Sequence, residues 1–152
     1  MLKIKNNKKF YLWAAASLLC MTAIFYFSSH NAEESGELSS SLTYKLFKDG
    51  AFMETLEVLV RKTAHVIIFA ALSFCTANTV RQVTQNKRYI FIISVTWCSF
   101  YAATDEWHQY FVPGRACMWQ DWVIDTLGVL LGIGAAFFIM RVADRHKLLK
   151  SA

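Results

Sequence analysis

Ionisable and amide side chains of this 152-residue chain gather in three short stretches of an otherwise apolar sequence. Arginine and lysine suit the binding of phosphate, and a histidine beside a carboxylate suits acid–base catalysis. We therefore predict one ligand-binding site, formed by Arg61, Lys62, His65, Asp105, Glu106, His108, Gln109, Arg115, Asp121 and Asp125. If the site is catalytic, its acid–base groups are expected to be His65, Asp105 and Asp125.

Metal binding is a further use of histidine and aspartate. His65, His108 and the aspartates could together hold a divalent ion, but their spacing matches no metal-ligand motif, and simple hydrogen bonding explains them as well. The chain also contains no glycine-rich phosphate loop. We therefore expect no metal and no cofactor.

The spacing of the site residues places them on three helix faces. Residues three or four positions apart lie on the same side of an α-helix. This rule groups Arg61 with His65, Asp105 with His108 and Gln109, and Asp121 with Asp125. Three such faces can meet in one pocket.

Two charged pairs are unfavourably placed for the helices that the sequence predicts. Arg61 and Lys62 come directly before an apolar run, although cations are unfavourable at a helix N-terminus. Asp105 and Glu106 lie near the end of another helix, where anions are unfavourable. We expect a cation of the first pair to meet an anion of the second across the bundle, because isolated charges in a membrane are costly. Asp121 is expected to be the N-cap of the last helix.

The composition indicates that membrane helices position these residues. Hydrophobic residues make up 55% of the chain and charged residues 18%, whereas an ordinary soluble domain is about 45–50% apolar and about 25% charged. The four cysteines form no CxxC pair, which excludes a disulfide scaffold. The net charge of +5 is not gathered on one face, so nucleic acid is not an expected partner.

Four apolar runs are candidates for membrane spans, since a helix needs about 20 residues to cross a bilayer. We predict an all-α fold, a single domain over residues 1–152, in which a four-transmembrane-helix bundle carries a short amphipathic outer segment. The spans are expected at about 10–27, 63–80, 89–111 and 121–140, with the outer loop at 28–62. A soluble helical bundle and a cleaved signal peptide at the first run are the alternatives, disfavoured by uncharged runs and by the lack of a cleavage motif.

Lysine and arginine predict the orientation of the bundle. Residues 1–9, 81–88 and 141–152 carry eleven basic residues and one acid, whereas the opposite side carries five basic residues and ten acids. Cytoplasmic loops of membrane proteins are rich in basic residues. We expect both termini in the cytoplasm and the polar stretches at the outer face of the membrane.

Two glycines in the last apolar run form a small-residue motif. Gly128 and Gly132 allow another helix backbone to approach closely. We expect this contact within the chain, with a homo-oligomer through the same glycines as the alternative.

Three motifs carry a resemblance to a known family. They are RKTAH at residues 61–65, DEWHQYFVPGR at residues 105–115 and DWVIDTLG at residues 121–128. In this order, between apolar runs, they resemble the VanZ-like family of small bacterial membrane proteins. The resemblance implies an all-helical integral protein of the bacterial cytoplasmic membrane and a link to teicoplanin resistance. Asp125 departs from the family pattern, since many relatives have asparagine there.

Two classes of function fit these residues. In the first, the site binds an anionic lipid headgroup or a lipid-linked cell-wall precursor and so contributes to glycopeptide resistance or envelope homeostasis, with Arg115 as the expected phosphate contact. In the second, the protein is a membrane enzyme acting on such a lipid, with His65 and Asp105 as the acid–base pair. We favour binding, because no serine or cysteine nucleophile stands beside a base in these stretches. A channel or transporter is a third option and would require an oligomer.

Overall fold

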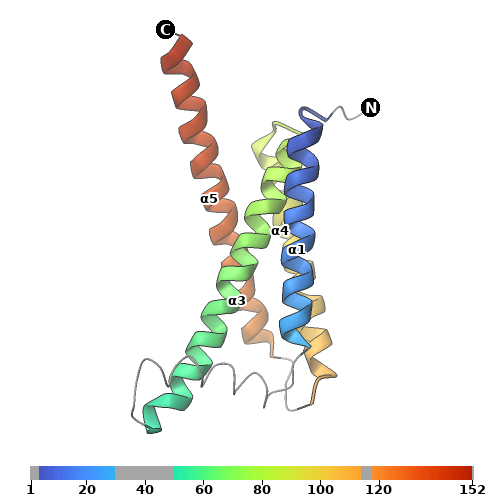
Figure 1. Ribbon diagram of the computed structural model, residues 1–152, viewed down its shortest axis with the longest axis vertical. Helices are drawn as coiled ribbons and strands as arrows, with labels where there is room; N and C mark the ends of the chain where they lie inside the picture. The colour runs from blue at the N-terminus through green and yellow to red at the C-terminus, as the bar shows by residue number, and fades with distance from the viewer. Residues whose placement is uncertain (1–3, 30–49, 114–117, 152) are drawn as a thin grey trace.

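All regular secondary structure in the described part of the chain is helical. The computed structural model describes residues 4–29, 50–113 and 118–151, which fold into four helices and no strand (Figure 1). The helices are α1 (Asn7–Ser28), α3 (Gly50–Arg81), α4 (Lys87–Tyr110) and α5 (Trp119–Ser151). The predicted all-α fold class is therefore confirmed.

Asparagine caps define the starts of two helices. The side chain of Asn6 accepts a hydrogen bond from the backbone N–H of Lys9 at 3.0 Å, which satisfies a donor that the first turn of α1 leaves unpaired. Asn86 serves α4 in the same way, accepting from the backbone N–H of Arg88 at 2.9 Å. The turn between α3 and α4 is short, so these two helices run in opposite directions.

The four helices form a bundle whose chain termini lie at the same end (Figure 1). Helices α3 and α5 run in one direction, and α1 and α4 run in the other. The backbone N–H of Lys5 donates to the carbonyl of Gln82 at 2.7 Å, which holds the N-terminal segment against the end of α3. The polar stretches predicted from the sequence therefore belong to the opposite end of the bundle.

Three of the described helices, α1, α3 and α5, are long and apolar enough to cross a membrane. Each of the three helices exposes large apolar side chains, most of all α1, where they include Leu12, Leu18 and Leu19. A soluble protein rarely leaves such a surface open to water, so the helices suit a lipid environment. Helix α4 is not among the three, because basic residues begin it and acidic residues lie near its end.

Glycine packing joins α3 to α5. A Cβ atom on Gly128 would lie 2.6 Å from the carbonyl oxygen of Val66, and one on Gly132 would collide with Ala70 and Ser73. The hydroxyl of Ser73 also donates to the carbonyl of Val129 at 2.8 Å. Gly128 and Gly132 therefore pack against α3, which is the contact within the chain that the sequence predicted.

Helix α3 begins much earlier than the predicted span. The sequence placed residues 50–62 in the outer loop, but they continue the helix, because no glycine or proline interrupts it between residues 51 and 81. Arg61 and Lys62 therefore lie about three turns inside α3. The argument that they are unfavourable at a helix N-terminus is wrong, since the dipole acts mainly within the first turn. Residues 30–49, including most of the predicted amphipathic segment, lie outside the described residues.

Candidate functional site

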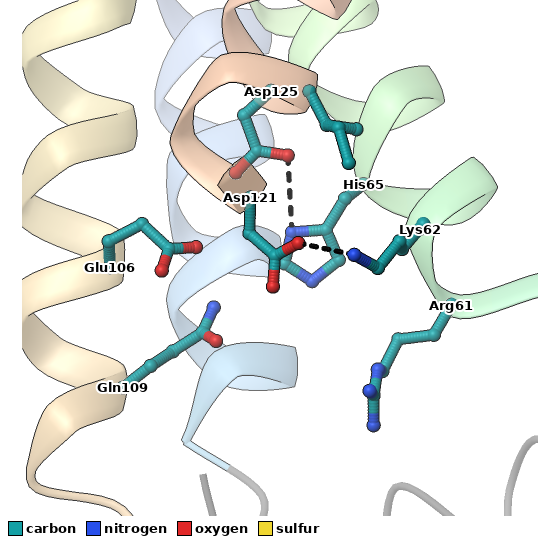
Figure 2. A pocket seen from close by; sticks show the side chains of 8 residues that line it. Arg61, Lys62, His65, Glu106, Gln109, Asp121 and Asp125 are labelled. Carbon is teal, nitrogen blue, oxygen red and sulfur yellow. Dashed lines mark hydrogen bonds and ion pairs between the residues drawn. The ribbon is translucent and has the colours of Figure 1, made fainter. Parts of the chain in front are cut away.

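A polar pocket lies between α3, α4 and α5, at the end of the bundle away from the termini (Figure 2). Its volume is about 20 Å³, which is room for one water molecule or one small ion. Seven of the residues that line it were predicted from the sequence, and the eighth is apolar. The lining residues are Arg61, Lys62, His65, Glu106, Gln109, Asp121, Ile124 and Asp125.

Lys62 and Asp121 form the shortest ion pair among the described residues. Lys62 Nζ donates to Asp121 Oδ1 at 2.6 Å, with the two side chains 33% and 27% exposed. The prediction that Arg61 or Lys62 pairs with Asp105 or Glu106 is therefore wrong among the described residues: Lys62 pairs with Asp121, and Arg61 forms no ion pair. Asp121 is also not the N-cap, because its backbone N–H already bonds to the carbonyl of Met118 and places it in the first turn of α5.

Glu106 lies near the end of α4, but its side chain contacts the start of α5. Its Oε2 atom accepts a hydrogen bond from the backbone N–H of Met118 at 3.2 Å, directly before the first residue of α5. A carboxylate at a helix N-terminus is stabilised by the unpaired N–H groups and by the helix dipole. The position of Glu106 is therefore explained by a neighbouring helix and not by a cation of α3.

Asp105 connects α4 to α1 and is only 4% exposed. Its Oδ2 atom accepts hydrogen bonds from the hydroxyl of Ser28 and from the amide of Gln109, both at 2.9 Å. Asp105 and Gln109 thus share a helix face as predicted. Sequence reasoning missed Ser28, which was assigned to a linker. The signal that could have found it is a serine at the end of an apolar run.

His65 and Asp125 lie side by side at the inner end of the pocket (Figure 2). His65 Nδ1 is 3.5 Å from Asp125 Oδ1, and Asp125 is 1% exposed. One ligand atom each of His65, Asp105 and Asp125 lies within 4.8 Å of the other two, so these three residues could hold a metal ion. The three predicted acid–base candidates are therefore brought together from α3, α4 and α5.

Three predicted site residues do not line the pocket, and one of them, Asp105, lies beside it. His108 faces α1, where its ring stacks on Phe25 with 4.7 Å between centroids and its Nε2 lies 3.1 Å from the hydroxyl of Ser29. It lies one position before Gln109, so the helix turns it roughly 100° away. Arg115 lies outside the described residues.

The formal charge of the site is negative. Glu106, Asp121 and Asp125 line the pocket, and Asp105 lies beside it, against two cations, Arg61 and Lys62. His65 is a seventh ionisable residue of the site and can be neutral or charged. Arg61 takes part in none of the ion pairs among the described residues, so its guanidinium is available to a ligand. The site can therefore offer an arginine at its mouth and carboxylates with an imidazole inside.

Comparison with known proteins adds a family to this geometry. A family model described as VanZ/LLP1 matches residues 13–141, from α1 to α5, and so includes α1 in addition to the motifs on the later helices. No curated protein and no solved structure matches the chain.

Proposed function

The chain belongs to the VanZ/LLP1 family, and from this premise we propose that it is a four-span protein of the bacterial cytoplasmic membrane. Its pocket binds the polar headgroup of an anionic lipid or of a lipid-linked cell-wall precursor. The binding contributes to resistance against glycopeptides of the teicoplanin type or to envelope homeostasis, by changing access to the headgroup.

Helix α4 supplies the fourth span in this proposal. Its 24 residues correspond to roughly 36 Å, more than the about 30 Å of a hydrocarbon core. Its exposed side chains include Phe91, Ile92, Trp97 and Phe100, whereas its acidic residues are buried against the other helices. Average composition therefore understates how apolar its outer surface is, and polar groups of a membrane helix are expected to face the bundle interior.

The orientation follows from the charges at the two ends. The end that carries the termini also carries the predicted cytoplasmic basic residues, among them Arg81 and Arg141. In that orientation the pocket opens toward the outer face, where cell-wall precursors become accessible to antibiotics.

Arg61 is the observation that carries the proposal of an anionic ligand. It lines the pocket on α3, and it has no ion-pair partner in the part of the chain that the structure describes. A guanidinium binds phosphate through two parallel hydrogen bonds, and a desolvated position strengthens them. Because the cavity holds only a small group, the phosphate lies at its mouth, and the lipid chains extend along the apolar outer surfaces of the helices.

The lipids that bind to the purified protein in nanodiscs test this proposal. Purified protein in nanodiscs should enrich phosphatidylglycerol over phosphatidylcholine when bound lipids are counted by native mass spectrometry. Arg61→Gln should reduce that enrichment about tenfold, as expected for loss of one charge-assisted phosphate contact. The matched control is Arg81→Gln, which removes the same charge from the other end of α3. Equal enrichment by the two variants would contradict the proposal.

A second candidate function is catalysis on the same lipid, favoured by the contact of 3.5 Å between His65 and Asp125. A carboxylate beside an imidazole can orient it as a general acid or base. His65→Gln distinguishes the two functions. If antibiotic susceptibility changes while the envelope lipids keep their chemical composition, binding is the function; a lipid modification that disappears with His65→Gln establishes catalysis.

A further inference from the structure

Three side chains, two of them lining the pocket and one beside it, carry donor atoms close to one another. They come from three different helices, and one ligand atom of each lies within 4.8 Å of the others, namely in His65, Asp105 and Asp125. We propose that these residues bind a divalent transition-metal ion. We also infer that the ion is the inner contact of the anionic headgroup, a part that rests on the proposed function.

The set of donor atoms favours one class of ion. One imidazole and two carboxylates suit zinc or manganese, whereas magnesium and calcium prefer oxygen ligands alone. Three protein ligands are typical of sites that leave a coordination position open. Here the open position faces a cavity of about 20 Å³, which is large enough for a water molecule or a single phosphate oxygen.

A buried carboxylate oxygen points independently to a ligand. Asp125 is 1% exposed, and its Oδ2 atom has no hydrogen-bond partner within the described residues. Figure 2 shows this oxygen on the side of the carboxylate that faces Glu106 across the pocket, away from the contact with His65. Buried polar atoms in native proteins are nearly always satisfied, so an atom of this kind indicates a bound ion or water.

Asp105 also has a free coordination position. Both of its hydrogen bonds, from Ser28 and from Gln109, reach Oδ2. Such hydrogen bonds hold a ligating carboxylate in place and are typical of the second layer of residues around a metal. The other oxygen, Oδ1, accepts no hydrogen bond in the part of the chain that the structure describes.

The charge of the site supports a cation with two positive charges. Lys62 is already paired with Asp121, and the pocket region holds four carboxylates against two basic side chains. A divalent ion brings the formal charges into balance. Burying unbalanced carboxylates is strongly unfavourable, so this balance is a physical reason for the ion.

The donor atoms of the three side chains would have to move only slightly closer together to bind one ion. Two ligands of a tetrahedral zinc ion, each about 2.1 Å from the metal, lie roughly 3.4 Å apart. The 3.5 Å between His65 Nδ1 and Asp125 Oδ1 is close to that spacing, and Oδ2 of the same carboxylate provides a second oxygen for the ion. A separation at the upper limit of 4.8 Å must shorten by roughly 1.4 Å to reach the same spacing.

Metal content measures the site directly. The protein is purified without a polyhistidine tag, treated with a chelator in phosphatidylcholine nanodiscs, and dialysed against Zn²⁺ or Mn²⁺. We expect one ion per chain by inductively coupled plasma mass spectrometry, and with Co²⁺ we expect the visible absorption bands of a four- or five-coordinate ion. Asp125→Asn should weaken binding at least tenfold, whereas the control Asp144→Asn, on the same helix at the other end of the bundle, should bind as the parent does.

Three results would overturn the metal site. The first is that the parent protein retains no ion. The second is that Asp125→Asn binds the ion as tightly as the parent does. The third is that Asp144→Asn and Asp125→Asn both bind the ion more weakly than the parent, and to the same extent. Circular dichroism and thermal melting check that each variant is folded. If Asp125→Asn is unfolded, His65→Gln takes its place, with the same expected loss.

Lipid enrichment measured with and without Zn²⁺ separates the two proposals. An ion that binds with no preference for phosphatidylglycerol would leave the metal site standing and contradict the proposed function. A preference for phosphatidylglycerol that survives both the chelator and Asp125→Asn would leave the proposed function standing and contradict the role of the ion. We expect the preference to fall at least fivefold in the chelator and to return when Zn²⁺ is added.

Discussion

Helices α3 and α5 are joined by two ion pairs, one beside the pocket and one near the end of the bundle that carries the termini. The two pairs differ. Beside the pocket, Lys62 Nζ lies 2.6 Å from Asp121 Oδ1, and both side chains are at least two-thirds buried. At the end that carries the termini, Arg81 Nη2 lies 3.4 Å from Asp144 Oδ1, and the side chain of Asp144 is 55% exposed. The same two helices thus hold one pair in a crowded polar site and one at an open surface.

The difference shows how position changes what a charge does. At the terminal end, most of the basic residues are exposed, although Arg81 is only 24% exposed, and we expect their main effect to be on topology. At the pocket end, Lys62, Glu106 and Asp125 each have a specific neighbour on another helix, so moving one residue disturbs the others. We therefore expect substitutions at the pocket end to have the larger effects, while the glycine contact between the two ends holds them at a fixed separation.

Breaking the glycine contact should have the largest effect. Gly132→Val places a side chain where the backbone of Ala70 and the hydroxyl of Ser73 already lie, so α3 and α5 must move apart. We expect a loss of about 3 kcal/mol or more in the free energy of unfolding, or no folded protein. Thermal unfolding in detergent measures it.

The same helix offers a matched control for this substitution. Gly134→Val adds the same side chain at a position with nothing within 4 Å, and we expect an effect below about 0.5 kcal/mol. Equal losses in the two variants would mean that α3 and α5 do not pack through Gly132.

Reversing the charge of Lys62 tests the pair beside the pocket. Lys62→Glu places a third carboxylate near Asp121 and Glu106, so we expect a loss of about 2–3 kcal/mol in the free energy of unfolding. The double variant Lys62→Glu and Asp121→Lys restores opposite charges and should recover about half of that loss. A double variant less stable than Lys62→Glu alone would show that the two side chains do not act as a pair.

Removing the hydroxyl of Ser28 should have a smaller effect. Ser28→Ala leaves the buried Asp105 with one hydrogen bond fewer, which we expect to cost about 1–2 kcal/mol in unfolding free energy. The control is Ser17→Ala on the same helix, whose hydroxyl only bonds back to the carbonyl of Trp13. Chemical unfolding of both variants measures the difference, and an equal response would remove Ser28 from the site.

The sequence predicted the helices and shared faces better than the contacts between helices. Apolar runs and the spacing of three or four residues depend only on local geometry, so Arg61 with His65 and Asp121 with Asp125 were grouped correctly. Which carboxylate meets Lys62 depends on how each helix is rotated about its axis. That rotation is decided by the packing of Gly128 and Gly132 against α3, which sequence spacing does not encode.

Two further errors have the same origin. The prediction gave Asp105 or Glu106 a cation as partner, because it considered only the dipole of their own helix, whereas Glu106 contacts the start of α5. It also placed His108 in the pocket, although the helix directs this side chain to α1. The expectation of no metal rested on the absence of a ligand motif, which covers only residues close in sequence, whereas the ligands proposed above come from three helices.

The pair at the terminal end should respond least. Asp144→Asn removes a carboxylate that is more than half exposed and lies 3.4 Å from its partner, so solvent and lipid headgroups already screen the interaction. We expect a change below about 0.5 kcal/mol in the free energy of unfolding, measured in the same detergent as the Lys62 variants. A loss as large as that of Lys62→Glu would mean that α3 and α5 are held equally at both ends. In that case the stability of the Lys62–Asp121 pair would be no evidence for a binding site, because the exposed pair, which lies at no such site, would contribute equally to the free energy of unfolding.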